Sequence, residues 1–552
     1  MLSLLSLLVV SSLQADERKL GSRPNVLLIC VDDLKPALGC YGDQTAKTPN
    51  IDRLASRGVT FESAYCNQAV CSPSRNALMT SLRPQTLGIY DLPTHFRKAA
   101  PDAVTLGQHL RQSGYRAEAL GKIFHVGHGN IDDKDSWDVP SFKAKAKTYA
   151  LTSGTIKRAK TDLESKGPAT ELAEVDDDFY ADGQVAVEAI RRLQAAARHP
   201  SQPFFIAVGF IRPHLPFVAP KKYWDLYKPE DIPMPQVLSS PKGAPEYAAT
   251  NSGELRSYSD IAKTGPIDET LTRQLIHGYY AATSYTDGQI GRLLSSLRDQ
   301  GLEENTLVVL WGDHGWHLGD HGMWCKHTNY EQATRIPVIV AGPSVAQGQK
   351  SSAMIETVDI YPTISSLCRL TPPTGIDGVS FDRVLEDPNR PGRESVIHVY
   401  PRGNRLGRAI RTQRYRLVEW KPFSDESGQA EYELYDYQID PLETKNLAST
   451  EPEVVSSLVR ILAEHPAPKP PRQSAMANGK AAKGNTVKPI DRAAMFNRRD
   501  RNGDKRLTFE EFMQTQPDPE AAKLRFPKFD FNGDGLLSPE EFIGKPKQAS
   551  GK

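Results

Sequence analysis

The sequence has few cysteines, no excess of either charge and no apolar run long enough to cross a bilayer. Six cysteines among 552 residues are too few and too scattered for a disulfide framework. The 68 basic and 67 acidic residues leave a formal net charge of +1, so no overall field favours nucleic acid or an anionic membrane. We therefore expect no disulfide scaffold, no nucleic-acid partner and no transmembrane segment.

The one membrane-like stretch lies at the start of the chain, MLSLLSLLVVSS. It is too short to span a bilayer but suits the apolar region of a secretory signal. No Lys or Arg precedes it, whereas Ser12 and Ala15 are small residues that offer cleavage sites. We predict a signal peptide over residues 1–15 and a periplasmic or secreted protein.

The composition is that of an ordinary globular protein, with 39% hydrophobic and 24% charged residues. The length excludes a lone small binding module and suggests several domains, or one large domain with an appendage. The apolar run at 25–31 is typical of a strand buried on both faces of a parallel sheet. A helix should follow, with Thr48 as N-cap, Pro49 at its first position and Gly58 as its end.

Further strand-like runs alternate with helical patterns, which favours a three-layer α/β sandwich. The strands are expected at 203–210, 306–311 and 336–341, and the helices at about 179–197, 271–299 and 357–369. After about residue 395 short strands at 415–420 and 432–436 predict a small antiparallel subdomain. The proposed boundaries are 23–394 for the α/β domain, 395–465 for the subdomain, 466–490 for a Pro-rich basic linker and 491–545 for a paired domain.

Polar residues follow two of the expected strands. Asp32 and Asp33 come directly after the first, and Asp313 and His314 follow the strand at 306–311. Open α/β sheets bind ligands at the carboxyl ends of their strands. Carboxylates in that number favour a hard divalent ion, calcium or magnesium, over zinc. For any one of these aspartates alone, a helix cap or turn is an equally good interpretation.

The segment Cys71-Ser-Pro-Ser-Arg75 is the sharpest signal. Pro73 can start a helix, which would place Cys71 at a helix N-terminus, where negative charge is favoured. A cysteine taken alone is more often a small core residue than a nucleophile. The pattern C-x-P-S-R, however, is the signature of the type I sulfatases of the alkaline-phosphatase superfamily, and this sequence resembles them.

The resemblance extends over roughly residues 23 to 465 and is strongest to the iduronate-2-sulfatases. It implies an alkaline-phosphatase-like sandwich and hydrolysis of a sulfate ester. The motifs that carry it, besides the cysteine segment, are Arg23–Asp33, Gly121–His125, Arg212–Phe217, Asp313–Gly319 and Lys326.

In that family the motif cysteine is oxidised to formylglycine, an aldehyde that hydrates to a gem-diol. The resemblance therefore implies a formylglycine-generating maturation enzyme as a partner. It also implies a calcium ion held by an oxygen of the modified Cys71 and by Asp32, Asp33, Asp313 and His314. The ion would favour ionisation of one hydroxyl, which attacks the sulfur.

Besides Cys71, five residues receive catalytic roles from the resemblance. Lys122 and Lys326 would face the sulfate as point charges, and Arg75 would hold the nucleophile by hydrogen bonds. His125 would deprotonate the second hydroxyl, which expels sulfate, while His214 would contact the sulfate or protonate the leaving alcohol. The two histidines could exchange roles. Taken alone, Lys122 could be a surface residue and His214 a structural loop residue.

Three functions remain open on the sequence. The first is hydrolysis of a sulfated carbohydrate, such as a uronate 2-sulfate in a polysaccharide. The second is phosphoryl transfer, as in a phosphatase or phosphodiesterase of the same superfamily, although those use Ser or Thr where Cys71 stands. The third is a calcium-dependent, non-catalytic glycan-binding protein.

Two twelve-residue segments near the C-terminus match the EF-hand calcium loop, each between two phenylalanines, so we predict an all-α EF-hand pair that binds up to two calcium ions. In the first, Lys505 replaces the glycine that makes the sharp turn, which should lower its affinity. The expected ligands are Asp500, Asn502, Asp504, Arg506 and Glu511 in the first loop and Asp530, Asn532, Asp534, Leu536 and Glu541 in the second.

Overall fold

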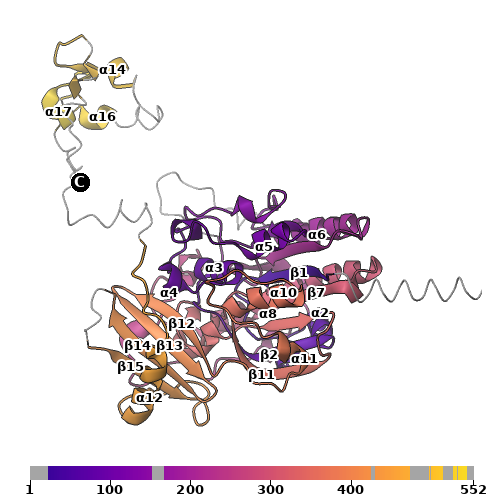
Figure 1. The fold of residues 1–552 in the computed structure, drawn as a ribbon. Helices are drawn as coiled ribbons and strands as arrows, with labels where there is room; N and C mark the ends of the chain where they lie inside the picture. The colour runs from indigo at the N-terminus through magenta and orange to yellow at the C-terminus, as the bar shows by residue number, and fades with distance from the viewer. Residues whose placement is uncertain are drawn as a thin grey trace, which may run out of the picture. The chain divides into compact units, whose positions relative to one another are not determined.

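The computed structural model describes residues 23–151, 167–423, 429–472, 496–497, 499–500, 502–513, 526–530 and 532–543. Its contacts divide the chain into two units, the first ending at Arg472 and the second beginning at Gln473 (Figure 1). The predicted signal peptide lies outside the described residues. No described helix combines the length and apolar composition that a bilayer crossing requires. All six cysteines are free thiols, as expected.

A seven-stranded sheet forms the centre of the first unit. Strand β1 lies in its middle, fully buried and parallel to both of its neighbours, β7 and β5. Only β10 runs antiparallel to its neighbours, so the sheet is mixed but mostly parallel. In spatial order the strands are β11 (Gln349–Glu356), β2 (Gly58–Tyr65), β10 (Val338–Ala341), β7 (Thr306–Gly312), β1 (Asn25–Val31), β5 (Phe204–Phe210) and β3 (Arg116–Gly121).

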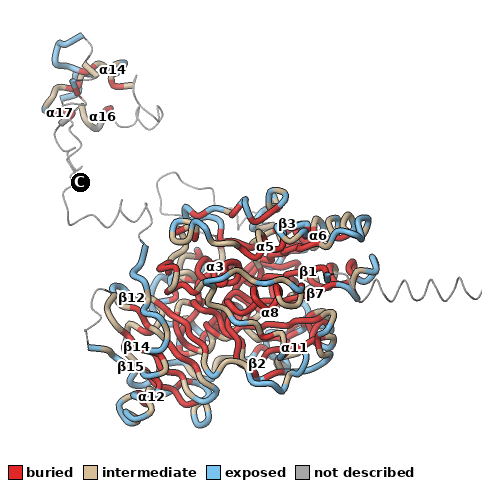
Figure 2. The backbone as a smooth tube through the Cα atoms, in the orientation of Figure 1, coloured by how far each residue is buried: buried red, intermediate tan, exposed pale blue. Residues whose placement is uncertain are grey.

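Alternate residues of β1 enter two separate cores, because successive side chains of a strand point to opposite faces. Val26 and Leu28 pack with one set of helices, and Leu27 and Ile29 pack with the other. Figure 2 shows both layers as buried chain around the sheet. The expected three-layer arrangement is therefore confirmed. The helices on the first face are α3 (Cys71–Thr80), α5 (Leu106–Gln112) and α10 (Ile360–Leu367), and those on the second are α2 (Pro49–Ala55), α6 (Ala181–Ala197) and α8 (Glu269–Asp299).

The helix predicted over 48–58 is shorter than expected. Thr48 is the N-cap residue, but its hydroxyl accepts a hydrogen bond from the Gly39 amide instead of capping the helix. Helix α2 ends at Ala55, and Gly58 begins β2, a strand that the sequence patterns did not reveal. Gly58 has to be glycine for a different reason: a Cβ there would lie 2.1 Å from the Val340 carbonyl oxygen of β10.

A four-stranded antiparallel sheet follows, as the sequence predicts. Helix α12 (Pro452–Ala463) covers it through an apolar cluster that includes Leu417 and Leu458. The chain then continues along the first unit, where the Lys469 amide donates to the Gln85 carbonyl at 2.9 Å. Residues 466–472 therefore still belong to the first unit, and the rest of the predicted linker lies outside the described residues. The strands are β12 (Ser395–Arg402), β13 (Arg405–Thr412), β14 (Tyr415–Pro422) and β15 (Glu431–Asp436).

The second unit has its own small core. Two short strands, β16 (Leu507–Thr508) and β17 (Leu536–Leu537), pair antiparallel. The phenylalanines that flank the two acidic loops pack together with one leucine from each strand. The described helices are α14 (Phe509–Met513), α16 (Phe526–Phe529) and α17 (Pro539–Ile543), and the core residues are Phe496, Leu507, Phe512, Phe526, Leu537 and Phe542.

Candidate active site

Two neighbouring strands deliver the predicted carboxylates to one edge of the sheet. Val31, the last residue of β1, is in register with Gly312, the last residue of β7, so Asp32 and Asp313 leave the sheet at the same level. The Asp33 amide donates to Asp313 Oδ1 at 3.0 Å. Asp33 also has a left-handed backbone, with φ of 58°, which turns the chain sharply at this point.

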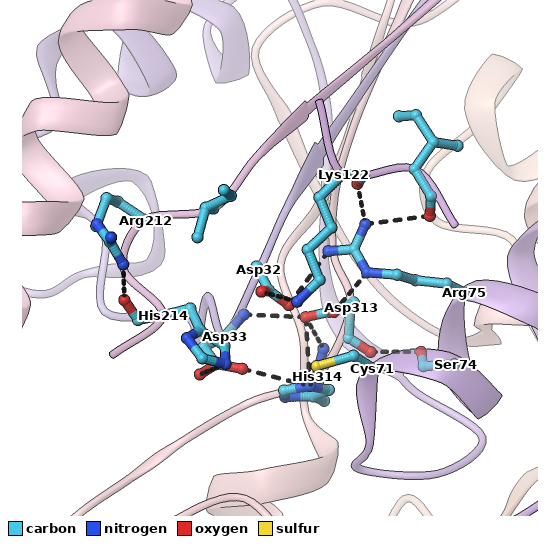
Figure 3. Close-up of polar contacts among 12 residues, drawn as sticks. Asp32, Asp33, Cys71, Ser74, Arg75, Lys122, Arg212, His214, Asp313 and His314 are labelled. Carbon is cyan, nitrogen blue, oxygen red and sulfur yellow. Dashed lines mark hydrogen bonds and ion pairs between the residues drawn. The ribbon is translucent and has the colours of Figure 1, made fainter. Parts of the chain in front are cut away.

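Cys71 reaches the same place from another direction. It is the first residue of α3, a helix whose ten residues are all buried. Its Sγ lies 3.4 Å from His314 Nε2, and Ser74 in the same turn donates to the Asp313 carbonyl at 2.5 Å. Figure 3 shows these side chains converging from the strand ends and the helix start.

The cluster has the donor set of a divalent cation site. One ligand atom each from Asp32, Cys71, Asp313 and His314 lie within 4.8 Å of one another, and all four residues are buried. A second, overlapping group replaces Asp313 and His314 with Asp33 and His214. Burial, together with Asp32, raises the pKa of Asp313 to about 7. A cation would relieve this crowding of carboxylates, so the residues fit one.

The Cys71 thiol itself is a weak nucleophile. Burial, followed by the charge of Asp32, raises its pKa well above the ordinary value. A thiol in that state carries almost no thiolate at neutral pH. The side chain therefore needs chemical conversion if residue 71 is to attack an ester.

Arg75 contacts the carboxylates, whereas the sequence predicted hydrogen bonds to the nucleophile. Its Nε donates to Asp313 Oδ2 at 2.9 Å and an Nη to Asp32 Oδ1 at 3.3 Å. The other Nη donates to the backbone carbonyls of Lys122 and Ile123. The side chain is fully buried. Its planar fork thus fixes two strand ends relative to each other.

Two lysines neutralise the remaining charge. Lys122 Nζ forms an ion pair with Asp32, and Lys326 Nζ lies 3.1 Å from Asp33 Oδ1. Burial alone would raise the pKa of Asp32, but Lys122, His214 and Arg75 hold it well below its usual value. The three carboxylates are therefore already matched by three basic side chains. A bound divalent cation would give the site surplus positive charge, which suits an anionic substrate.

The comparisons with known proteins agree with this geometry. Residues 24–369 match the family model described as Sulfatase, and residues 319–465 match the one described as N-sulphoglucosamine sulphohydrolase, C-terminal. The protein belongs to the sulfatase family. It is a sulfuric ester hydrolase of the alkaline-phosphatase superfamily.

Relatives of this sulfatase cover most of its length. Iduronate 2-sulfatase from Homo sapiens is 32% identical over 500 residues, which cover 77% of this chain and 90% of that protein. Two solved structures share the fold: BT4656 in complex with its substrate D-glucosamine-2-N,6-O-disulfate (TM-score 0.64, 23% identity, 80% of this chain and 97% of that one) and the phosphonate monoester hydrolase of Agrobacterium radiobacter (TM-score 0.64, 21% identity, 80% and 95%).

The contacts of two histidines of this sulfatase bear on the roles expected for them. His214 Nδ1 donates to the Leu215 carbonyl at 2.6 Å, and its Nε2 lies 3.9 Å from Asp33 Oδ2, at the cation site. His125 Nε2 contacts His128 Nδ1 at 3.1 Å, and the two rings stack. Burial, followed by Lys122, lowers the pKa of His125 to about 3. His125 is therefore neutral at physiological pH.

Two residues near the site, Glu254 and His128, were not predicted from the sequence. Glu254 lies in an irregular stretch between the expected elements, where no motif identifies it. His128 follows His125 in a glycine-rich turn, and the neighbouring histidine was its one sequence signal. By contrast, His317 and His321 from the same segment as Asp313 make structural hydrogen bonds, to Thr328 Oγ1 and the Leu442 carbonyl.

Proposed function

We propose that this sulfatase removes sulfate from a sulfated sugar, using a formylglycine made from Cys71 beside a divalent cation. The observation that carries the proposal is the position of Cys71 Sγ within the cluster of Asp32, Asp313 and His314. The high pKa of the thiol supports conversion, since an unmodified side chain would be a weak nucleophile. A formylglycine-generating enzyme is the implied maturation partner.

Two similar proteins support a substrate class. One is named iduronate 2-sulfatase, and one structural neighbour was solved with a sulfated glucosamine. We propose a uronate 2-sulfate or a related sulfated polysaccharide as the substrate. Secretion or export to the periplasm would bring the enzyme to such a polymer, in agreement with the apolar start of the chain.

Each catalytic side chain has a role that its position supports. A cation bound by Asp32, Asp33, Asp313 and His314 would supply the charge that favours an oxyanion at residue 71, with calcium as the proposed ion. Lys122 and Lys326, beside their carboxylates, would face the sulfate as point charges, and Arg75 would keep the two strand ends in place. His125, held neutral, would accept a proton from residue 71, and His214 would meet the sulfate or the leaving oxygen.

We also propose that the second unit binds calcium through the two acidic loops. In both loops the first aspartate accepts a backbone hydrogen bond from the glycine three residues later, and the last glutamate accepts one from a backbone amide. The carboxylates are thus already turned into the loops. Short paired strands and a shared phenylalanine core would couple the two sites, as in an EF-hand pair.

Two measurements test the proposed reaction. Mass spectrometry of the peptide spanning residue 71, from protein made in its native host, should find formylglycine; an unmodified thiol in active protein would remove the proposed nucleophile. Assays with an aryl sulfate and an aryl phosphate then separate sulfatase from phosphatase activity. A preference above about tenfold for phosphate would overturn the proposal. A panel of sulfated disaccharides should show uronate 2-sulfate turned over fastest.

A further inference from the structure

A carboxylate outside the predicted machinery contacts two of its nitrogen-bearing side chains. Glu254 Oε2 lies 2.8 Å from Lys326 Nζ, and Glu254 Oε1 lies 3.0 Å from His214 Nε2. One oxygen therefore serves each partner. The side chain is largely enclosed, with 15% of its surface exposed, while Lys326 is 3% exposed.

This placement is unfavourable unless it is compensated. Lys326 already pairs with Asp33, so a second carboxylate is not needed to neutralise it. A negative group beside a pocket that binds an anion repels the substrate, and enclosing it costs desolvation energy. Lys326 and His214 must both face the same anion, and each loses side-chain freedom when it does so. A carboxylate that contacts both fixes their orientation.

The backbone around Glu254 is fixed to the segment that carries Lys326. The Trp324 amide, two residues before Lys326, donates to Ser252 Oγ at 3.0 Å. On the other side, Ser257 Oγ donates to the Glu254 carbonyl at 2.6 Å, in the short 3-10 helix η8 (Leu255–Ser257), where Leu255 is fully buried. The carboxylate thus comes from a rigid support, as a positioning group must.

We propose that Glu254 is a positioning residue that holds Lys326 and His214 in the geometry in which both face the sulfate group. The inference rests on the proposed function, since it takes from it that these two side chains contact the ester. Glu254 itself does not touch the reacting atoms. Its effect on turnover is exerted through these two side chains, and it should vanish when they are absent.

The test is a double-mutant cycle on the full-length, matured enzyme. Glu254→Gln keeps the shape and removes the charge; it should lower kcat/KM about 20-fold, mainly through kcat, because Lys326 and His214 are needed most where charge develops in the transition state. Glu246→Gln, an exposed carboxylate on the same stretch of chain, is the matched control and should stay within about twofold of wild type. Glu254→Asp should recover part of the activity.

The decisive arm combines Glu254→Gln with Lys326→Met. If Glu254 acts through Lys326, the Gln substitution should cost less than about threefold in the Lys326→Met background, since coupled residues are not additive. An unchanged 20-fold cost in that background, or activity of Glu254→Gln within about twofold of wild type, would overturn the inference. The cycle is measured on whichever ester the wild type hydrolyses. A wild-type preference for phosphate would thus contradict the proposed substrate without deciding the role of Glu254.

Discussion

The two units of this protein build their proposed cation sites in opposite ways. In the first unit, the ligands come from three distant segments, at residues 32–33, 71 and 313–314, and all are buried among charged partners. In the second unit, each loop supplies its ligands from twelve consecutive residues, and residues 502–506 and 532–535 of these loops are exposed. A buried site assembled from strand ends depends on the whole sheet, whereas a contiguous exposed loop depends mainly on its own turn.

The difference has a consequence for what each site can do. Burial strengthens every charge interaction in the first unit and makes an unpaired charge costly there. The folded site therefore needs three basic side chains as much as the carboxylates that they contact, namely those of Arg75, Lys122 and Lys326. The exposed loops of the second unit carry no comparable cost, so their substitution should act locally. Three predictions test this contrast.

The largest expected effect separates the two sites by activity. Asp313→Asn removes a carboxylate that contacts Arg75 and belongs to the proposed cation cluster, and kcat/KM should fall by at least about 100-fold. Glu541→Gln in the second unit should leave kcat/KM within about twofold, as should a chain ending at Arg472. Loss of turnover in the shortened chain would show that catalysis requires the second unit. It would contradict the expected independence of the two units.

Much of this arrangement was predictable from the sequence, because the chemistry lies at the ends of recognisable strands. The apolar runs before Asp32 and Asp313 predicted the sheet edge, and the C-x-P-S-R motif placed Cys71 at a helix start. The strand that begins at Gly58 was not predicted, because its residues show no clear alternation of apolar and polar side chains. Its glycine also matches the residue expected at the end of a helix. Glu254 was missed because its partners, Lys326 and His214, are distant in sequence and meet it only through the fold.

The residues that form the site were easier to predict from the sequence than the role of each residue. Arg75 was expected to contact the nucleophile, yet its guanidinium is directed at Asp32, Asp313 and two carbonyls. The acceptor that a long, flexible side chain contacts depends on packing between several elements, so residue spacing along the chain does not predict it. The same holds for His125, whose ring nitrogen contacts His128.

The second prediction compares the two loops of the second unit. Lys505 has a left-handed backbone with φ of 62°, where the other loop has Gly535 with φ of 77°. A residue with a Cβ costs about 1 kcal/mol in that region. Lys505→Gly should therefore tighten calcium binding by the first loop about fivefold, measured by calorimetry in a Glu541→Gln background. Lys505→Ala, which keeps the Cβ, is the control; an equal gain there would assign the effect to the lost charge.

The smallest effect concerns acid sensitivity, which should be confined to the first unit because all 13 histidines lie before Gln473. His398 is fully buried, and burial followed by Arg416 lowers its pKa to about 3. The unfolded chain takes up a proton near pH 6.5 that the folded chain refuses, so stability falls as the pH drops from there toward 3. Tryptophan fluorescence follows this unit alone, since all six tryptophans belong to it.

The free energy of unfolding, measured with urea, should therefore fall between about pH 7.5 and pH 5.5 by about 1 kcal/mol more in the wild type than in His398→Gln. Glutamine retains a donor for the Asn329 carbonyl that His398 Nε2 contacts at 3.2 Å, so the variant removes the titration and keeps the hydrogen bond. Equal pH dependence in the two proteins would mean that His398 is protonated in the folded state. Its charge would then have to be stabilised by Glu331 or Glu356, the acidic groups that act on it, and the buried charges of the first unit would be less strictly paired than the active site suggests.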